Sequence, residues 1–165
     1  MRLLLCGAAA ACCILAGCWR AGALARRVRQ LDAALLLCEK LRACLRYERR
    51  TTAELACWLA GQESLRPLDF LPRCAALLRE KTPFPAAWRQ SLEESGLAAD
   101  DRALLLQIGG VLGGSRAEDQ LGELSVLGGL LQESRDAAAA EQRQKGRLCH
   151  SLGILGGIGL AILLW

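Results

Sequence analysis

The sequence predicts an all-α protein, a small bundle of about five to six helices flanked by transmembrane helices at its N- and C-terminal ends. The first observation behind this prediction is composition: Ala, Leu, Arg and Glu dominate the 165 residues, aromatic residues make up 4%, and there are four prolines. The second is the absence of any run of alternating Val, Ile, Thr or Tyr, the pattern that would indicate a strand.

The third observation is the confinement of charge. All seventeen acidic residues and every base except Arg2 lie between Arg20 and Arg147, which leaves Leu3–Trp19 and Leu148–Trp165 uncharged. We therefore expect three segments. Residues 1–19 form a transmembrane helix or a signal peptide, residues 20–147 a cytoplasmic helical bundle, and residues 148–165 a second transmembrane helix.

The first uncharged tract allows two interpretations. Arg2 alone precedes it and four arginines follow closely, so the positive-inside rule favours a retained helix with the central domain in the cytoplasm. Alternatively, Leu15–Cys18 has the form of a bacterial lipoprotein cleavage site, which would make Cys18 an acylated N-terminus and the domain extracytoplasmic.

The second tract of eighteen residues spans about 27 Å as a helix, close to a hydrocarbon core of about 30 Å. Gly153 and Gly157 are four residues apart and predict a smooth surface for helix–helix packing in the membrane.

Five helices are expected before the last one. Residues 24–45 repeat apolar side chains at steps of three and four (Leu24, Val28, Leu31, Leu35, Cys38, Leu41, Leu45). Thr51 and Glu54 predict a capping box for a second helix that ends near Gly61. Pro67 is expected in the first turn of a third helix. Pro83 and Pro85 open a fourth that ends near Gly96, with Trp88 and Leu92 buried, and Asp100 or Asp101 caps a fifth that ends at Gly113-Gly114.

Ser115 and Glu118 predict a second capping box, and no proline follows it. The last helix could therefore run from Arg116 into the membrane, with Gly128-Gly129 as its weakest point, since each glycine costs about 1 kcal/mol relative to alanine.

Charge divides the chain into three parts. Residues 20–50 carry a net +6, residues 51–141 a net −6, and residues 142–165 a net +3. The basic parts adjoin the uncharged tracts, where they can meet anionic membrane lipids. The acidic bulk of the domain argues against nucleic-acid binding.

No residue pattern indicates chemistry. The nine cysteines contain no Cys-x-x-Cys pair and the one histidine is His150, so no metal site is expected, and we interpret the cysteines as reduced and structural. The carboxylate pairs 93–94, 100–101 and 118–119 are neighbours on helices and point about 100° apart, which suggests solvated helix ends. We expect no catalytic, metal-binding or cofactor-binding residues and no enzyme activity.

Several short segments, in order along the chain, resemble the stage III sporulation protein AB family. They are Arg29-Gln30-Leu31, Ala87-Trp88, Leu112-Gly113 with Gln120, and the ending Ser151-Leu152-Gly153 through Leu164. The resemblance implies a non-enzymatic component of the channel complex between mother cell and forespore, similar to the inner-membrane platform proteins of type II secretion. It also implies a multi-pass location in the mother-cell membrane, with partners that include other stage III sporulation operon proteins and a secretion-type ATPase.

Our functional hypothesis is a membrane platform whose −6 region docks a basic partner and which could form homo-oligomers. The alternative is a lipoprotein acylated at Cys18 that carries an extracytoplasmic scaffold or chaperone domain.

Overall fold

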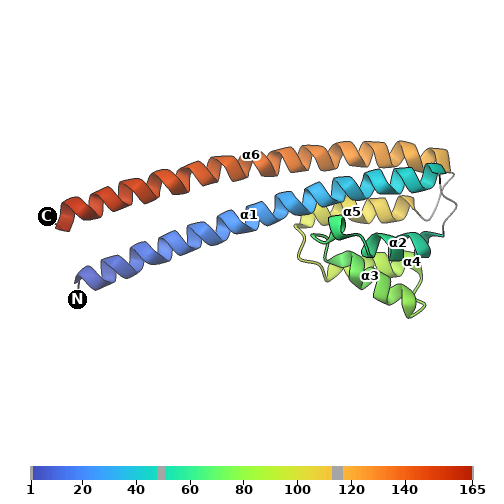
Figure 1. The fold of residues 1–165 in the computed structure, drawn as a ribbon, viewed down its shortest axis with the longest axis horizontal. Coiled ribbons are helices and arrows are strands. Elements are labelled where there is room, and N and C mark those ends of the chain that lie inside the picture. Colours follow the sequence, from blue (N-terminus) through green and yellow to red (C-terminus); the bar gives the residue numbers. More distant parts are fainter. Residues whose placement is uncertain (1, 48–50, 113–116, 165) are drawn as a thin grey trace. The chain divides into compact units, whose positions relative to one another are not determined.

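The computed structural model describes the backbone of residues 2–47, 51–112 and 117–164, and the side chains of residues 19, 22–47, 51–112 and 119–144. Within these ranges the chain forms six α-helices and one 3₁₀ turn, with no strand, which confirms the all-α prediction (Figure 1). The elements are α1 (Arg2–Tyr47), α2 (Thr52–Ala60), the 3₁₀ turn η1 (Glu63–Leu65), α3 (Phe70–Arg79), α4 (Phe84–Glu93), α5 (Ala99–Val111) and α6 (Ala117–Leu164).

The chain divides into two compact units. One combines residues 1–26 with residues 137–165, and the other consists of residues 27–136. In the part of the chain with described side chains, no helix is long and apolar enough to span a bilayer. Apart from Trp19, the two predicted spans lie outside that part, and so do Cys18, Gly153 and Gly157. The boundaries at 19–20 and 147–148 stay predictions.

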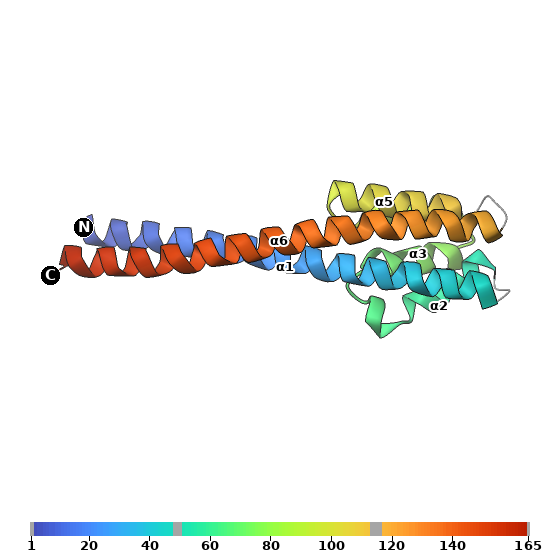
Figure 2. The same cartoon turned by 90° about the horizontal axis from the view of Figure 1, so that it is seen from above.

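In the second unit, α1 contributes a buried stripe that is wider than the sequence predicts. Leu31, Cys38 and Leu41 are buried as expected, whereas Leu35 and Leu45 are half-buried. The additional buried side chains are Gln30, Ala33, Ala34, Leu37 and Cys44. In both views α1 and α6 lie side by side along this unit (Figure 1, Figure 2). Contact with more than one neighbouring helix explains the broader stripe.

The predicted start of α2 is confirmed. The Glu54 backbone N–H donates to Thr51 Oγ1 at 3.3 Å, and the Thr51 N–H donates to Glu54 Oε2 at 3.1 Å, completing a capping box. Gly61 is the C-cap, with φ −83°. Trp58 is half-buried, and Lys40 Nζ lies 5.5 Å from the centre of its ring.

Two predicted helix ends are wrong by a few residues. Pro67 precedes α3, which begins at Phe70, because the chain first makes a turn in which the Leu68 N–H donates to the Leu65 carbonyl. Gly96 lies two residues beyond the α4 C-cap, Glu94, and its N–H donates to Asp69 Oδ2 at 3.3 Å. α4 begins as predicted, with Pro83 at the N-cap and the next proline in its first turn.

Trp88 joins three helices in the core. Its ring lies 5.1 Å from that of Phe70 in an edge-to-face arrangement, and its Nε1 donates to the Leu105 carbonyl at 2.8 Å. A Cβ on Gly109 would overlap the Trp88 ring, so glycine is required there for α5 to approach α4. The helices follow one another in contact, α2 with α3, α3 with α4, and α4 with α5.

The expected side-chain cap of α5 is wrong. The N-cap is Ala98, which makes no side-chain cap, and Asp100 and Asp101 lie within the first helical turn. The predicted stop at Gly113-Gly114 and the second capping box at Ser115–Glu118 fall outside the described residues. The long last helix is confirmed, because α6 continues unbroken from Ala117 to Leu164 through Gly128 and Gly129.

Candidate interaction surface

A single buried carboxylate connects three helices of the bundle. The Asp101 side chain is 3% exposed and accepts hydrogen bonds from Arg27 Nε at 2.8 Å and Arg27 Nη2 at 3.0 Å. Ser134 Oγ donates a third hydrogen bond to Asp101 at 2.9 Å. Since Arg27 belongs to α1 and Ser134 to α6, this carboxylate fixes both long helices against α5.

The burial of Asp101 corrects the expectation that the pair 100–101 marks a solvated helix end. Asp100 is exposed, whereas Asp101 points inward to a bidentate arginine, the geometry that best compensates a desolvated carboxylate. No sequence signal identified the contacts of Asp101, because Arg27 and Ser134 are 74 and 33 residues away along the chain.

A second polar contact lies nearer to solvent. Arg135 Nε donates to Asp32 Oδ1 at 2.9 Å, and Arg135 Nη1 donates to Asp136 Oδ1 at 3.1 Å. The hydrogen bond to Asp32, and to a smaller extent the hydrogen bond to Asp136, raises the pKa of Arg135 above its ordinary value. The contact joins α1 to α6 on the side that faces water, where screening limits its contribution.

The exposed charges of the bundle are unevenly distributed. In residues 52–96 the exposed charged side chains are six carboxylates and five bases. In α5 and residues 119–136 of α6, every exposed charged side chain is a carboxylate, and the two bases with described side chains, Arg102 and Arg135, are half-buried. We call the exposed carboxylates of this region the acidic surface: Asp100, Asp119, Glu123, Glu133 and Asp136.

Part of the acidic surface borders an open groove of about 720 Å³ between α5 and α6. The groove is lined by Gln107 and Val111 of α5 and by Asp119, Gly122, Glu123, Val126 and Leu127 of α6. Val126 is 65% exposed, although it is a large apolar side chain. An apolar floor with a carboxylate rim can accept an apolar side chain that is flanked by bases.

The exposure of Val126 and Leu130 could have been predicted from their positions in the sequence. The buried residues of α6 follow steps of four, three and four from Gln120 to Leu131. Val126 and Leu130 lie outside this register, and at about 100° per residue both point about 90° or more away from the centre of the buried stripe.

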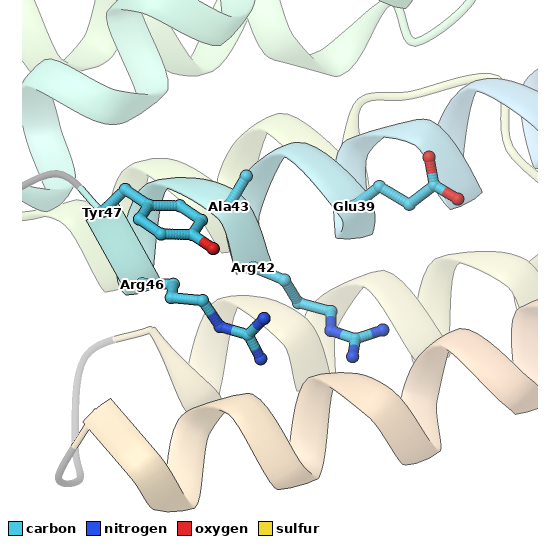
Figure 3. A pocket seen from close by; sticks show the side chains of 5 residues that line it. All are labelled: Glu39, Arg42, Ala43, Arg46 and Tyr47. Carbon is cyan, nitrogen blue, oxygen red and sulfur yellow. The ribbon is translucent and has the colours of Figure 1, made fainter.

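The last turns of α1 present the opposite charge. Glu39, Arg42, Ala43, Arg46 and Tyr47 line a shallow hollow of about 230 Å³, and Figure 3 shows both guanidinium groups extending to the same side of the helix. Tyr47 is 79% exposed. We call Arg42, Arg46 and Tyr47 the basic face.

The cysteines with described side chains are free thiols, and Cys38, Cys44 and Cys74 are buried. Burial raises the pKa of Cys38 to about 11, although Arg42 acts in the opposite direction. Burial likewise raises the pKa of Cys74 to about 11, against a hydrogen bond with Ser91. Both are therefore protonated at neutral pH, as expected of apolar packing groups rather than nucleophiles.

The described carboxylates of the other two predicted pairs lie on the surface. Glu93, Glu94 and Asp119 are exposed, and Glu118 lies outside the residues with described side chains. Arg73 Nε donates to Glu94 Oε2 at 2.9 Å, and this bond lowers the pKa of Glu94. Among the described residues, no group of three or more His, Cys, Asp or Glu side chains is placed to hold a metal ion.

Comparison with known proteins agrees with the resemblance found in the sequence. The family model of stage III sporulation protein AB matches residues 2–165. A solved structure of stage III sporulation protein AB has a similar fold, with a TM-score of 0.62 and 20% identity, covering 72% of this chain and 98% of that chain. No curated protein matches the sequence.

Proposed function

Since the chain belongs to the stage III sporulation protein AB family, we propose that it is a non-enzymatic platform in the sporulation channel complex between mother cell and forespore. Its role is similar to that of the platform proteins of type II secretion. Helices at residues 1–19, which carry only the charge of Arg2, and at residues 148–165 anchor it in the mother-cell membrane, and the helical bundle faces the mother-cell cytoplasm.

One observation carries this proposal. The same unbroken helix, α6, contains both the carboxylates of residues 119–136 and the uncharged tract of residues 148–164. The helix that carries these carboxylates therefore continues along the chain into the proposed membrane anchor. The 83% exposure of Trp19, next to Arg20, also supports an interfacial position, which tryptophan favours.

The docking partner in this proposal is a protein with a basic surface, in the first place the secretion-type ATPase of the same operon. Within the −6 region we assign docking to the acidic surface, because the exposed charges in residues 52–96 nearly cancel. Complementary charge increases the association rate and selects the partner, with a strong dependence on ionic strength.

The test is capture of the ATPase by the full chain in a mild detergent. We expect capture at low salt and its loss when Asp100→Lys and Glu133→Lys are combined. A matched double variant, Glu63→Lys with Glu93→Lys, changes the net charge equally outside the acidic surface and should retain binding. Failure of the native chain to capture the ATPase, or equal loss in both variants, contradicts the proposed docking surface.

The orientation has its own test, because the lipoprotein alternative places the domain outside the cell. The intact mass of the membrane-extracted protein distinguishes an uncut chain from one that begins at acylated Cys18. An impermeant thiol reagent applied to whole cells should leave Cys57 unmodified, as determined by peptide mapping. A chain that begins at acylated Cys18, with Cys57 modified, would establish the alternative.

A further inference from the structure

The groove between α5 and α6 and the basic face carry opposite charges. Asp119 and Glu123 on one side, and Arg42 and Arg46 on the other, make no ion pair with any described residue. We propose that the groove between α5 and α6 binds the basic face of a second copy of this chain.

Spacing supports this assignment. Arg42 and Arg46 are four residues apart on α1, and Asp119 and Glu123 are four residues apart on α6. Each pair therefore lies on one side of its helix with a rise of about 6 Å. Two parallel arginine–carboxylate bonds can form at once when the helices lie against each other.

The apolar parts of the two surfaces also correspond. Tyr47 exposes 79% of its surface beside the two arginines, and Val126 exposes 65% beside the two carboxylates. A tyrosine in a carboxylate-rimmed apolar groove is typical of the centre of a protein interface.

Glycine leaves the groove open for a close approach. Gly122 lines the groove as an exposed helical residue, and a Cβ there would meet no atom within 4 Å. A glycine in a helix costs about 1 kcal/mol relative to alanine, and packing against the described residues does not require one here. The missing side chain lets a helix of a second copy approach the groove closely.

The contact joins two different surfaces, so it is heterologous and each copy retains one free groove and one free face. The basic face lies in the last turns of α1 and the carboxylate pair in the first turns of α6, and both lie at the same end of the bundle (Figure 1, Figure 2). Copies held in the same orientation in one membrane thus present both surfaces at one level, which favours a ring or row.

The test uses the purified full chain in a mild detergent, without any other protein, so it is independent of ATPase docking. The native chain should associate in a concentration-dependent manner at low salt, as measured by sedimentation velocity. Loss of the groove carboxylates (Asp119→Asn with Glu123→Gln) or of the face arginines (Arg42→Gln with Arg46→Gln) should weaken association about ten-fold or more.

Mixing the two variants decides the geometry. The groove variant keeps its basic face and the face variant keeps its groove, so a mixture should form one-to-one dimers and nothing larger. Glu63→Gln with Glu93→Gln serves as the control and should assemble like the native chain, and circular dichroism confirms that each variant is folded. A native chain that stays monomeric, two variants that assemble normally, or a mixture that does not pair would overturn the proposal. Loss of ATPase capture with intact self-association would instead contradict only the proposed docking function.

Discussion

The helices α2–α4 and the helices α5–α6 of the same bundle are stabilised by different interactions and present different surfaces. Around α2–α4 the core is apolar and aromatic, with Trp88, Phe70 and Cys74 all fully buried, and the outer charges are mixed. At α5–α6 a buried carboxylate, Asp101, connects the helices, and the outer charges are carboxylates.

The two sides of the bundle therefore differ both in packing and in exposed charge. Mixed charges on a well-packed apolar core are typical of a solvated structural face, whereas charge of a single sign beside an exposed apolar groove is typical of a binding face. Buried ion pairs contribute little net stability compared with apolar packing, but they select one arrangement of the helices. In this protein Asp101 connects α5 and α6, the two helices that border the groove.

The largest effect is expected from removal of the aromatic centre. Trp88→Ala should reduce the free energy of unfolding by about 3–5 kcal/mol, because it leaves a large cavity between α3, α4 and α5. It also leaves the Leu105 carbonyl without its hydrogen bond. Urea unfolding of the full chain in detergent, followed by circular dichroism, measures the loss. A cost smaller than that of Asp101→Asn would contradict the assignment of the main apolar core to this region.

The second largest effect is expected at alkaline pH, which should lower the free energy of unfolding through the apolar region. The pKa of Cys74 is about 11 in the folded chain against 9.0 for an ordinary thiol. Because the unfolded chain releases this proton first, stability is fully present below pH 9 and is lost as pH rises toward 11. The loss is on the order of 2–3 kcal/mol. Cys74→Ala should make the stability profile between pH 9 and 11 less steep, and the slope that remains should fall further when Cys38, whose pKa is also about 11, is replaced as well. Equal slopes in the native chain and Cys74→Ala would refute the effect.

Asp101→Asn tests the hydrogen bonds that the buried Asp101 carboxylate accepts from Arg27 and Ser134. The amide cannot accept the bidentate bond of Arg27 in the same way, and we expect a loss of about 1–3 kcal/mol. Amide hydrogen exchange should increase in α5 and in the part of α6 near Ser134, with little change in α3. Asp100→Asn removes a neighbouring exposed carboxylate and should be nearly neutral. A uniform rise in exchange through the bundle would contradict a specific role of Asp101 in holding α5 against α6.

The smallest effect is expected at the exposed pair. Arg135→Ala removes the contact with Asp32 and should lower the stability only slightly, because the contact lies near solvent. The cost should shrink further in high salt, since both groups are partly exposed and their interaction is screened. Thermal unfolding at low and high salt would show this. A loss of stability that persists in high salt would indicate that the Arg135–Asp32 pair is as important as the contacts of Asp101.

Local features of the fold could be predicted from the sequence. The capping box of α2, the proline-initiated start of α4, the inward position of Trp88 and the long unbroken α6 depend on residues that are close along the chain. The start of α3 and the end of α4 were less accurate, because the turn at Leu65–Leu68 and the contact of Gly96 with Asp69 are tertiary features. The segments that resemble the family contain buried residues such as Gln30, Trp88 and Gln120, so the family signature records packing more than binding.

The candidate surface was only partly predictable. Net charge located a −6 region, but it could not separate α2–α4, where exposed charges balance, from α5–α6, where they do not. Val126 could have been found from its position outside the register of α6. The groove could not, since its walls come from helices whose adjacency depends on Asp101, Arg27 and Ser134.

The sequence by itself determined the helical class, most helix starts, the confinement of charge between Arg20 and Arg147, and the resemblance to the family. These properties follow from composition, periodicity and neighbouring residues, all of which are local along the chain. Only the tertiary structure decided that Asp101 is buried while Asp100 is exposed, and that the exposed acidic charge gathers beside an open apolar groove. The physical reason is distance along the chain: the hydrogen bonds of Asp101 join residues 33 and 74 positions apart, and their energies depend on burial that only the folded chain creates.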